Sequence, residues 1–152
     1  MRLIVFSDSH GSIACMREAL FAHPEADMII HLGDGERDLG RLDELVAGRK
    51  VVQVCGNCDI YSQFPVNELV DAAGGRIFCS HGHAEFVKHG TQAFIEKARS
   101  TGARIALYGH THQAVTKYDD GLHIMNPGSI RAGEYGIIDI TPSGIMLINA
   151  DV

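Results

Sequence analysis

Most of the apolar runs in the first three quarters of this 152-residue chain end in Asp, Asn or His, beside a Gly or Ser. Short apolar runs bounded in this way are typical of buried strands. When such strands lie parallel in one sheet, the side chains that follow them meet at its carboxyl edge. The residues placed in this way are Asp8, His10, Asp34, Asn57, His81, His83, His110 and His112.

These side chains offer carboxylate and amide oxygens and imidazole nitrogens, and they need no thiolate. Such a donor set suits two closely spaced divalent ions, and paired ions suit phosphoryl chemistry. Each short pattern has another explanation: Asp34 could cap a helix, Asn57 could be a turn residue after Gly56, and a single histidine is usually a hydrogen-bonded surface or core group. Two His-x-His pairs and one Asp-x-His pair, all after strand-like runs, together favour a metal centre.

Composition excludes several classes of protein. The formal net charge of −6 argues against broad nucleic-acid binding, which requires a basic surface. The length predicts a single domain over residues 1–152. No apolar stretch has the length of a membrane span, and the first residues indicate a strand that meets a charge at Asp8. We therefore expect a cytoplasmic protein with no membrane segment.

The predicted elements change in style along the chain. The first half alternates strands at 3–6, 27–32 and 50–55 with helices at 13–21 and 38–47, which is typical of parallel α/β structure. The second half predicts hairpins at 66–72/76–79, 113–118/122–125 and 135–140/145–148, a helix at 84–100 with Phe86, Ala93, Phe94 and Ala98 facing inward, and a strand at 104–108. We expect two facing mixed sheets with helices outside, a four-layer αββα sandwich.

Cys55 and Cys58 form a C-x-x-C pattern, which is typical of redox proteins when it opens a helix. Here Pro65 follows soon after and the intervening residues lack helical periodicity. A structural zinc site would need a second such pair, and the sequence has none. We therefore interpret this pattern as coincidental. A redox protein remains as a third functional hypothesis, after an enzyme and a protein-interaction scaffold.

The ordered set of motifs resembles the calcineurin-like metallophosphoesterase family. It consists of Asp8-x-His10, Gly33-Asp34, Gly56-Asn57, His81 and Gly109-His110-Thr111-His112. Cys58-Asp59 and Asn126-Pro127-Gly128-Ser129 resemble the small bacterial and archaeal phosphodiesterase branch of that family. The resemblance covers residues 8–129, and it implies the metallo-dependent phosphatase fold.

The resemblance also implies a role for each motif residue. Asp8, His10 and His112 would hold the first metal, Asn57, His81 and His110 the second, and Asp34 would bridge them. The ions would be manganese, with iron, nickel or zinc as alternatives. His83 would lie beside the ligands or near the substrate, and residues 126–129 would form a supporting loop. The remaining histidines, His23, His31, His89 and His123, match no ligand of the family and are expected to be structural or exposed.

The implied reaction is hydrolysis of a phosphate diester by in-line attack of a metal-bridging hydroxide. The predicted catalytic residues are Asp34, Asn57, Cys58, His81 and His83. Many relatives carry a histidine at the position of Cys58, where it protonates the leaving group. A thiol is a weaker acid for this role, so we expect modest activity, with His83 as a partial substitute.

The main alternative is a protein-interaction scaffold like the retromer subunit that shares this fold. In that branch ligand positions are altered, whereas all seven are intact here, which favours an enzyme. We expect a small phosphodiester substrate and a homo-oligomer, either a dimer or a larger assembly.

Overall fold

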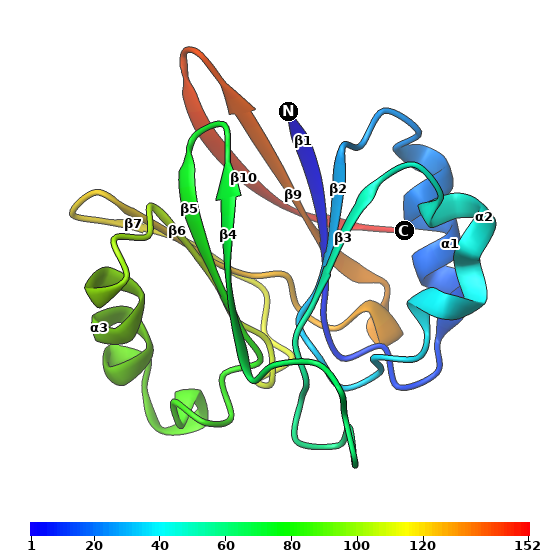
Figure 1. Ribbon diagram of the computed structural model, residues 1–152, viewed down its shortest axis with the longest axis horizontal. Helices are drawn as coiled ribbons and strands as arrows, with labels where there is room; N and C mark the ends of the chain where they lie inside the picture. Colours follow the sequence, from blue (N-terminus) through cyan, green and yellow to red (C-terminus); the bar gives the residue numbers. More distant parts are fainter.

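Two five-stranded sheets face one another in the computed structural model, which describes residues 1–152 (Figure 1). The first sheet has the order β10 (Gly144–Asp151), β9 (Glu134–Thr141), β1 (Arg2–Phe6), β2 (Met28–His31) and β3 (Lys50–Gln53). The second has the order β4 (Asn67–Ala72), β5 (Gly75–Ser80), β6 (Ile105–Leu107), β8 (Leu122–Asn126) and β7 (Val115–Asp119).

Both sheets are mixed. In the first sheet, β1, β2 and β3 are parallel, and β9 runs antiparallel to both β1 and β10. In the second sheet, β5, β6 and β8 are parallel, whereas β4 and β7 are antiparallel edge strands. The three hairpins predicted from sequence are present, as β4–β5, β7–β8 and β9–β10.

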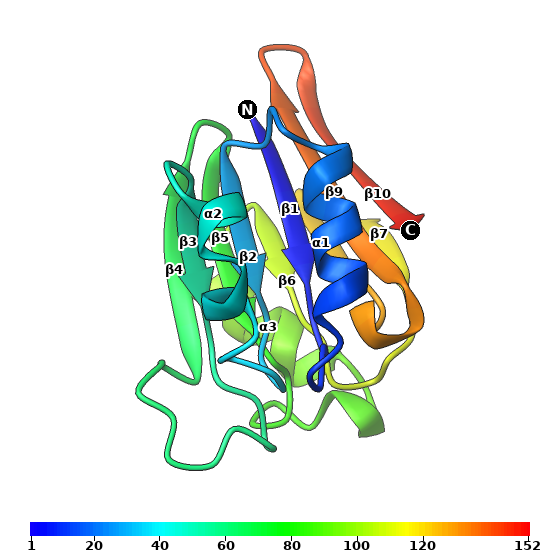
Figure 2. The same ribbon diagram turned by 90° about the vertical axis from the view of Figure 1, so that its right-hand side faces the viewer.

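Helices cover the outer face of each sheet, which confirms the four-layer sandwich (Figures 1 and 2). The helix α1 (Ile13–Ala22), the 3-10 turn η1 (Leu39–Leu42) and the short α2 (Asp43–Val46) lie on the first sheet. The second sheet is covered by α3 (Gln92–Ser100), which follows the 3-10 turn η2 (Val87–His89). A further 3-10 turn, η3 (Ile130–Ala132), precedes β9. No helix is long and apolar enough to cross a membrane.

The alternation of side chains along each strand explains these layers. Leu3 and Val5 of β1 belong to the core between the sheets, whereas Ile4 and Phe6 pack in the core beneath α1. A strand that is buried on both faces is apolar throughout, because successive side chains point to opposite sides. A third core, which includes Phe78 and Phe94, lies between the second sheet and α3.

Two predicted helices are shorter than expected. Residues 38–47 form only η1 and the four-residue α2, and in the 84–100 segment the α-helix begins at Gln92. Phe86 adopts a left-handed conformation (φ 55°), which a continuous helix cannot contain. Phe86 and Ala93 are therefore exposed instead of facing inward, and Val87 and Ile95 occupy the buried positions.

Candidate metal centre

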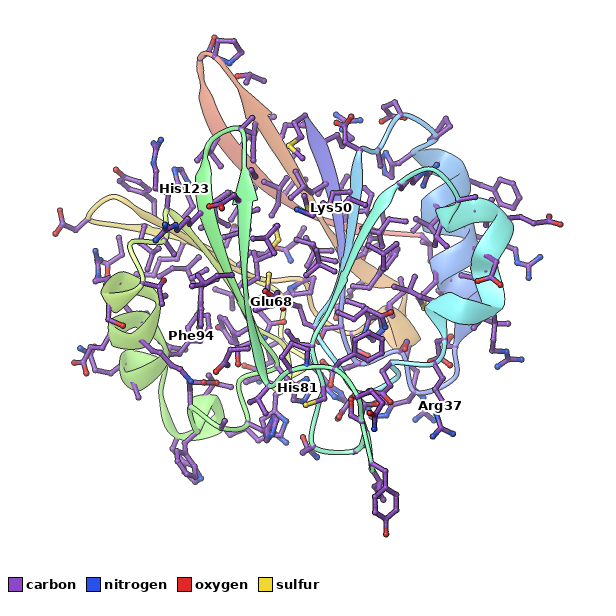
Figure 3. The ribbon with its side chains drawn as sticks, in the orientation of Figure 1. Arg37, Lys50, Glu68, His81, Phe94 and His123 are labelled. Carbon is purple, nitrogen blue, oxygen red and sulfur yellow. The ribbon has the colours of Figure 1, made fainter.

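The loops after β1, β2, β3, β5 and β6 gather at one end of the two sheets, where His81 is labelled in Figure 3. All seven predicted ligands lie on these loops. Five of them have positive φ angles: Asp8 (55°), His10 (42°), Asp34 (57°), His110 (67°) and His112 (55°). Non-glycine residues rarely adopt this region, and they concentrate there at functional sites because the surrounding structure must hold them.

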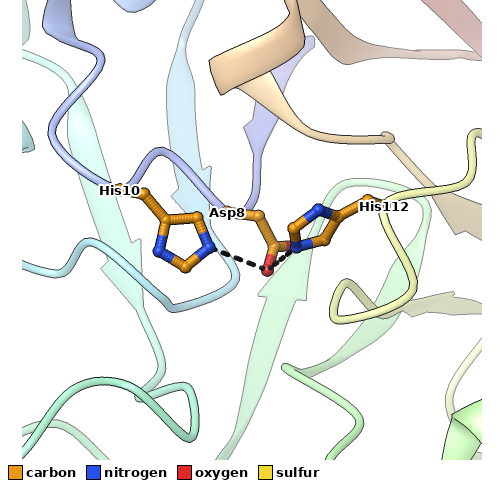
Figure 4. Close-up of side chains that lie close together, drawn as sticks. All are labelled: Asp8, His10 and His112. Atoms are coloured by element: carbon orange, nitrogen blue, oxygen red, sulfur yellow. Dashed lines mark hydrogen bonds and ion pairs between the residues drawn. The ribbon is translucent and has the colours of Figure 1, made fainter.

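Asp8 lies between two imidazole rings (Figure 4). Its Oδ1 atom is 3.0 Å from His112 Nε2 and 3.9 Å from His10 Nε2. Its other oxygen, Oδ2, accepts hydrogen bonds from the Ser7 hydroxyl (2.5 Å) and the His110 backbone N–H (3.0 Å). One oxygen is therefore held by the protein, while the other is presented to the rings.

A second group of donors surrounds His81, which is fully buried. Its Nδ1–H donates to the Leu32 carbonyl (2.8 Å), so in the neutral ring the Nε2 atom carries a lone pair. That atom lies 3.2 Å from Asn57 Oδ1 and 3.1 Å from His110 Nδ1. Two lone-pair atoms, His81 Nε2 and Asn57 Oδ1, thus face each other, an arrangement that a shared cation would stabilise.

Asp34 connects the two groups. Its Oδ2 atom is 3.8 Å from His10 Nε2 in the first group and 3.5 Å from His81 Nε2 in the second. Its Oδ1 atom accepts the Cys58 backbone N–H at 2.8 Å. The free oxygen of a nearly buried carboxylate therefore points between the donors of both predicted ions.

The residues present fit a pair of divalent ions. Hard oxygen and imidazole donors converge, and each carboxylate presents one of its oxygens to imidazole nitrogens. Burial, followed by the neighbouring His81, lowers the pKa of His110 to about 4, which keeps its ring in the neutral form that binds metals. The structure brings all seven predicted ligands together, and their assignment to individual ions remains a prediction.

Asp59 anchors two of the ligand loops. Its carboxylate accepts four backbone N–H bonds, from Asp34 (2.7 Å), Gly35 (2.9 Å), Glu36 (3.2 Å) and Gly56 (2.8 Å). Burial opposes the charged form, but these hydrogen bonds outweigh it and hold the pKa of Asp59 below its usual range. Sequence reasoning noted Asp59 only as part of the family resemblance, because nothing in its spacing shows which N–H groups it binds.

The two loops also approach each other so closely that only glycine fits. A Cβ atom on Gly33 would lie 2.4 Å from the Gly56 backbone nitrogen. A Cβ atom on Gly56 would lie 2.1 Å from Asp34 Oδ1. The Gly-Asp and Gly-Asn patterns therefore have a steric reason as well as a chemical one.

His31 is buried and joins the Asp8 loop to the Asp34 loop. Its Nδ1 atom accepts the Gly33 N–H (3.2 Å), so its Nε2–H donates to Ser9 Oγ (3.0 Å). The Ser9 hydroxyl donates in turn to Asp38 Oδ2 (2.6 Å). Burial lowers the pKa of His31 to about 4, so the ring is neutral near pH 7. The expectation that His31 is structural agrees with these contacts.

Residues 126–129 hold the loops that carry Asp8, His110 and His112, in agreement with the expected supporting loop. The Asn126 amide donates to the Gly109 carbonyl (3.0 Å) and to Thr111 Oγ1 (2.9 Å), which steadies the loop that carries His110 and His112. The Ser129 hydroxyl donates to the Asp8 carbonyl at 2.9 Å.

His83 and Cys58 lie at the margin of the donor cluster. The His83 ring is 5.5 Å from that of His81, and its buried Nδ1 atom has no hydrogen-bond partner. The Cys58 side chain is exposed, and its sulfur lies within 4.8 Å of donor atoms of His10 and Asp34. Burial of the sulfur, followed by the nearby Asp34, raises the pKa of the Cys58 thiol, so it carries its proton near neutral pH.

The remaining histidines and cysteines lie outside the donor groups. His23 bonds to Tyr135, His89 is exposed, and His123 packs against the Tyr118 ring. All four cysteines are free thiols, and residues 55–58 lead into turns instead of a helix. The C-x-x-C pattern therefore lacks the helical setting of a redox pair.

Comparisons with known proteins agree with this geometry. The model of the calcineurin-like phosphoesterase superfamily domain matches residues 1–141. The chain belongs to this superfamily. Members of the superfamily hydrolyse phosphoric esters with the help of metal ions, which is the chemistry that the clustered Asp and His donors support.

Several relatives of this phosphoesterase have been named. It is 33% identical to the probable metallophosphoesterase YsnB of Bacillus subtilis, over 86% of this chain and 76% of that protein. It is 29% identical to the phosphodiesterase YfcE of Escherichia coli K12, over 98% of this chain and 93% of that protein.

Solved structures share the fold. A predicted phosphoesterase from Streptococcus pneumoniae superposes with a TM-score of 0.76 at 25% identity, covering 98% of this chain and 97% of that one. Vps29 of Chaetomium thermophilum superposes with a TM-score of 0.79 at 12% identity, covering 99% and 97% of the two chains. The second likeness concerns the fold alone.

Proposed function

We propose that this phosphoesterase is a phosphodiesterase with a dinuclear metal centre. The observation that carries the proposal is the position of Asp34 Oδ2, which lies 3.8 Å from His10 Nε2 and 3.5 Å from His81 Nε2. In this proposal Asp34 would bridge the ions, with Asp8, His10 and His112 holding one and Asn57, His81 and His110 holding the other. The relative YfcE, which is named a phosphodiesterase, supports the choice of a diester.

The charges of the site favour an anionic substrate. When bound, two divalent ions supply a nucleophilic water at neutral pH and neutralise charge on the phosphoryl oxygens. Only Asp8 and Asp34 of the seven donors are anionic, while the others are neutral, so the loaded site keeps a net positive charge. A diester is drawn to this site despite the overall negative charge of the chain.

We propose Cys58 and His83 as the side chains that would bring a proton to the leaving group. Cys58 is an exposed residue whose sulfur lies close to Asp34, and partial burial of the sulfur, followed by that carboxylate, raises the pKa of its thiol. His83 is half-buried, and its ring lies 6.3 Å from that of His110. General acid catalysis contributes about 10²–10⁴-fold, so a thiol in this role predicts modest rates with poor leaving groups.

The ions we propose are manganese, with iron, nickel or zinc as alternatives, because carboxylate and imidazole donors accept all of these. We further propose that the substrate is a small phosphodiester and that the protein does not bind nucleic acids broadly. We also propose that residues 1–152 form one domain, that the chain assembles as a dimer or larger oligomer, and that the protein is cytoplasmic.

Reconstitution with metal tests the proposal. The protein is stripped with a chelator, reloaded with manganese, and assayed on bis(p-nitrophenyl) phosphate and on p-nitrophenyl phosphate, with elemental analysis of the loaded protein. We expect about two ions per chain, loss of activity on stripping, and faster turnover of the diester. Equal activity with and without bound metal would contradict the proposal.

The second candidate is a protein-interaction scaffold, and the fold likeness to Vps29 is the observation that favours it. A scaffold would show no hydrolysis under any metal supplied, even where a metal ion is bound. Intact donors at all seven positions favour the enzyme, because a scaffold has no need of a carboxylate aimed at two imidazole groups.

A further inference from the structure

A cleft of about 570 Å³ opens directly beside the donor cluster. His10, Gly11 and Asp34 form one part of its wall, and the segments 35–38 and 58–61 form the rest. Figure 3 shows Arg37 at the same end of the molecule as His81, on the side of the α2 helix. A group attached to a phosphate held at the metal centre would therefore have this cleft next to it.

The carboxylates of the cleft already have hydrogen-bond partners. Asp38 accepts bonds from Ser9 and Gly11, and Asp59 accepts four backbone N–H bonds. Glu36 accepts the Ser62 hydroxyl. None of these three acids forms an ion pair with Lys or Arg within 4.0 Å, so their negative charges repel an anionic group. The hydrogen bonds they accept leave fewer oxygen lone pairs for a cationic group.

Three further side chains of the cleft, Arg37, Ile60 and Tyr61, are planar or apolar and take no part in the donor cluster. Ile60 is 70% exposed and Tyr61 is 91% exposed, and Tyr61 adopts a positive φ of 61°. Arg37 is exposed and makes no ion pair within 4.0 Å, and it is the only Lys or Arg that lines the cleft. Tyrosine rings and guanidinium groups both present flat surfaces on which another ring can stack.

We propose that this cleft binds one ester arm of the substrate, and that this arm ends in a flat, uncharged ring, either an aryl group or a nucleobase, contacted by Tyr61, Arg37 and Ile60. The inference rests on the proposed phosphodiesterase function and names the class of diester. A ring matches the two planar side chains, whereas an anionic arm would meet Glu36, Asp38 and Asp59. Stacking of a base on an aromatic side chain strengthens binding about tenfold.

Pairs of ligands that differ only in the ring test this inference. Calorimetry on the manganese-loaded protein compares phenylphosphonate with methylphosphonate, and adenosine 5′-monophosphate with ribose 5-phosphate. We expect the ring to tighten binding about tenfold in at least one pair. The first pair reports an aryl preference and the second a nucleobase preference. No ring preference in either pair would overturn the proposal.

Variants then locate the ring. In the Tyr61→Ala variant, the ligands with and without the ring should bind with affinities that differ by no more than about twofold. The affinity for methylphosphonate should be retained. Tyr118→Ala, which alters a 65%-exposed tyrosine on β7, is the matched control and should change nothing. Arg37→Lys keeps the positive charge but removes the planar guanidinium group, so it should also weaken the preference for ligands with a ring. A ring preference that survives Tyr61→Ala, or a Tyr61→Ala variant that changes only the oligomeric state, would refute the assignment.

Binding and turnover separate the two proposals. Calorimetry measures ring preference without hydrolysis, so a protein that prefers rings but cleaves no diester contradicts the enzymatic function and leaves the cleft as a ring-binding site without a substrate arm. A protein that cleaves diesters without ring preference contradicts the cleft assignment alone.

Discussion

The two ends of the sandwich use strained backbone in opposite ways. At the end opposite the donors, the hairpin turns place glycine at positive φ, as at Gly75, Gly121 and Gly144, with Asp120 the only other residue type there. At the donor end, seven non-glycine residues adopt positive φ: Asp8, His10, Asp34, Tyr61, Phe86, His110 and His112.

This difference shows where the fold accepts an energetic cost. A turn that only reverses the chain uses glycine, since glycine adopts positive φ without steric penalty. A turn that must aim a carboxylate or an imidazole cannot use glycine, so it carries a cost on the order of 1–3 kcal/mol per residue. Asp59, His31 and Asn126 hold such turns through hydrogen bonds to their backbone or to neighbouring side chains.

Asp34→Asn should produce the largest effect and tests the comparison directly. Loss of the negative charge between the two donor groups should lower diester turnover by at least about a thousandfold and weaken both metals. Asp120→Asn changes the strained aspartate at the opposite end and should leave activity unchanged. Turnover of bis(p-nitrophenyl) phosphate and metal content per chain are the measurements. An Asp34→Asn variant with full rate and two metals would mean that the site is misassigned.

Asp59→Asn sharpens the comparison by loosening the anchor of two donor loops. The amide keeps one acceptor but loses the charge that binds four N–H groups, so we expect turnover to fall about 10–100-fold. Asp71→Asn, on an exposed strand end, is the control. If turnover and metal affinity were both unchanged, Asp59 would not position the loops.

His31 should make stability depend on pH. Burial holds its folded pKa at about 4, against 6.5 for the free group. The unfolded chain therefore gains the proton first, and the stability from neutral His31 is complete above pH 6.5 and is lost as the pH falls toward 4. The lost stability is about 2–3 kcal/mol at pH 4.5.

Urea unfolding of metal-free protein at pH 7 and pH 4.5 measures this effect. His31→Gln should remove that part of the difference between the two pH values, whereas His89→Gln, at an exposed position, should not. The same pH dependence in wild type and His31→Gln would show that other groups cause it.

Cys58→His should have the smallest effect, with equal or moderately increased diester turnover. Cys58 is exposed, so the imidazole can be accommodated, and it is a better proton donor than a thiol. The clearest gain is expected with diesters that have poor leaving groups, measured as kcat at saturating substrate. A large decrease would give the cysteine a role of its own.

Local sequence patterns were sufficient for the architecture, and with the family resemblance they indicated the donor residues that the fold brings together. Strands that are apolar throughout must be buried on both faces, so runs such as residues 3–6 and 27–32 predict sheets covered on both sides. The glycine-containing turns predict the three hairpins, since few residue types fit such turns. The order of the Asp, Asn and His residues indicates the phosphoesterase superfamily.

The tertiary structure alone decided which atoms meet. Whether Asp34 Oδ2 lies between His10 and His81 depends on residues more than twenty positions apart, and no local spacing encodes such a distance. The early break at Phe86, the buried role of His31 and the anchoring by Asp59 arise in the same way, because packing against distant segments outweighs local preference. Sequence periodicity determines which face of a strand is buried, whereas the convergence of the loops determines the chemistry.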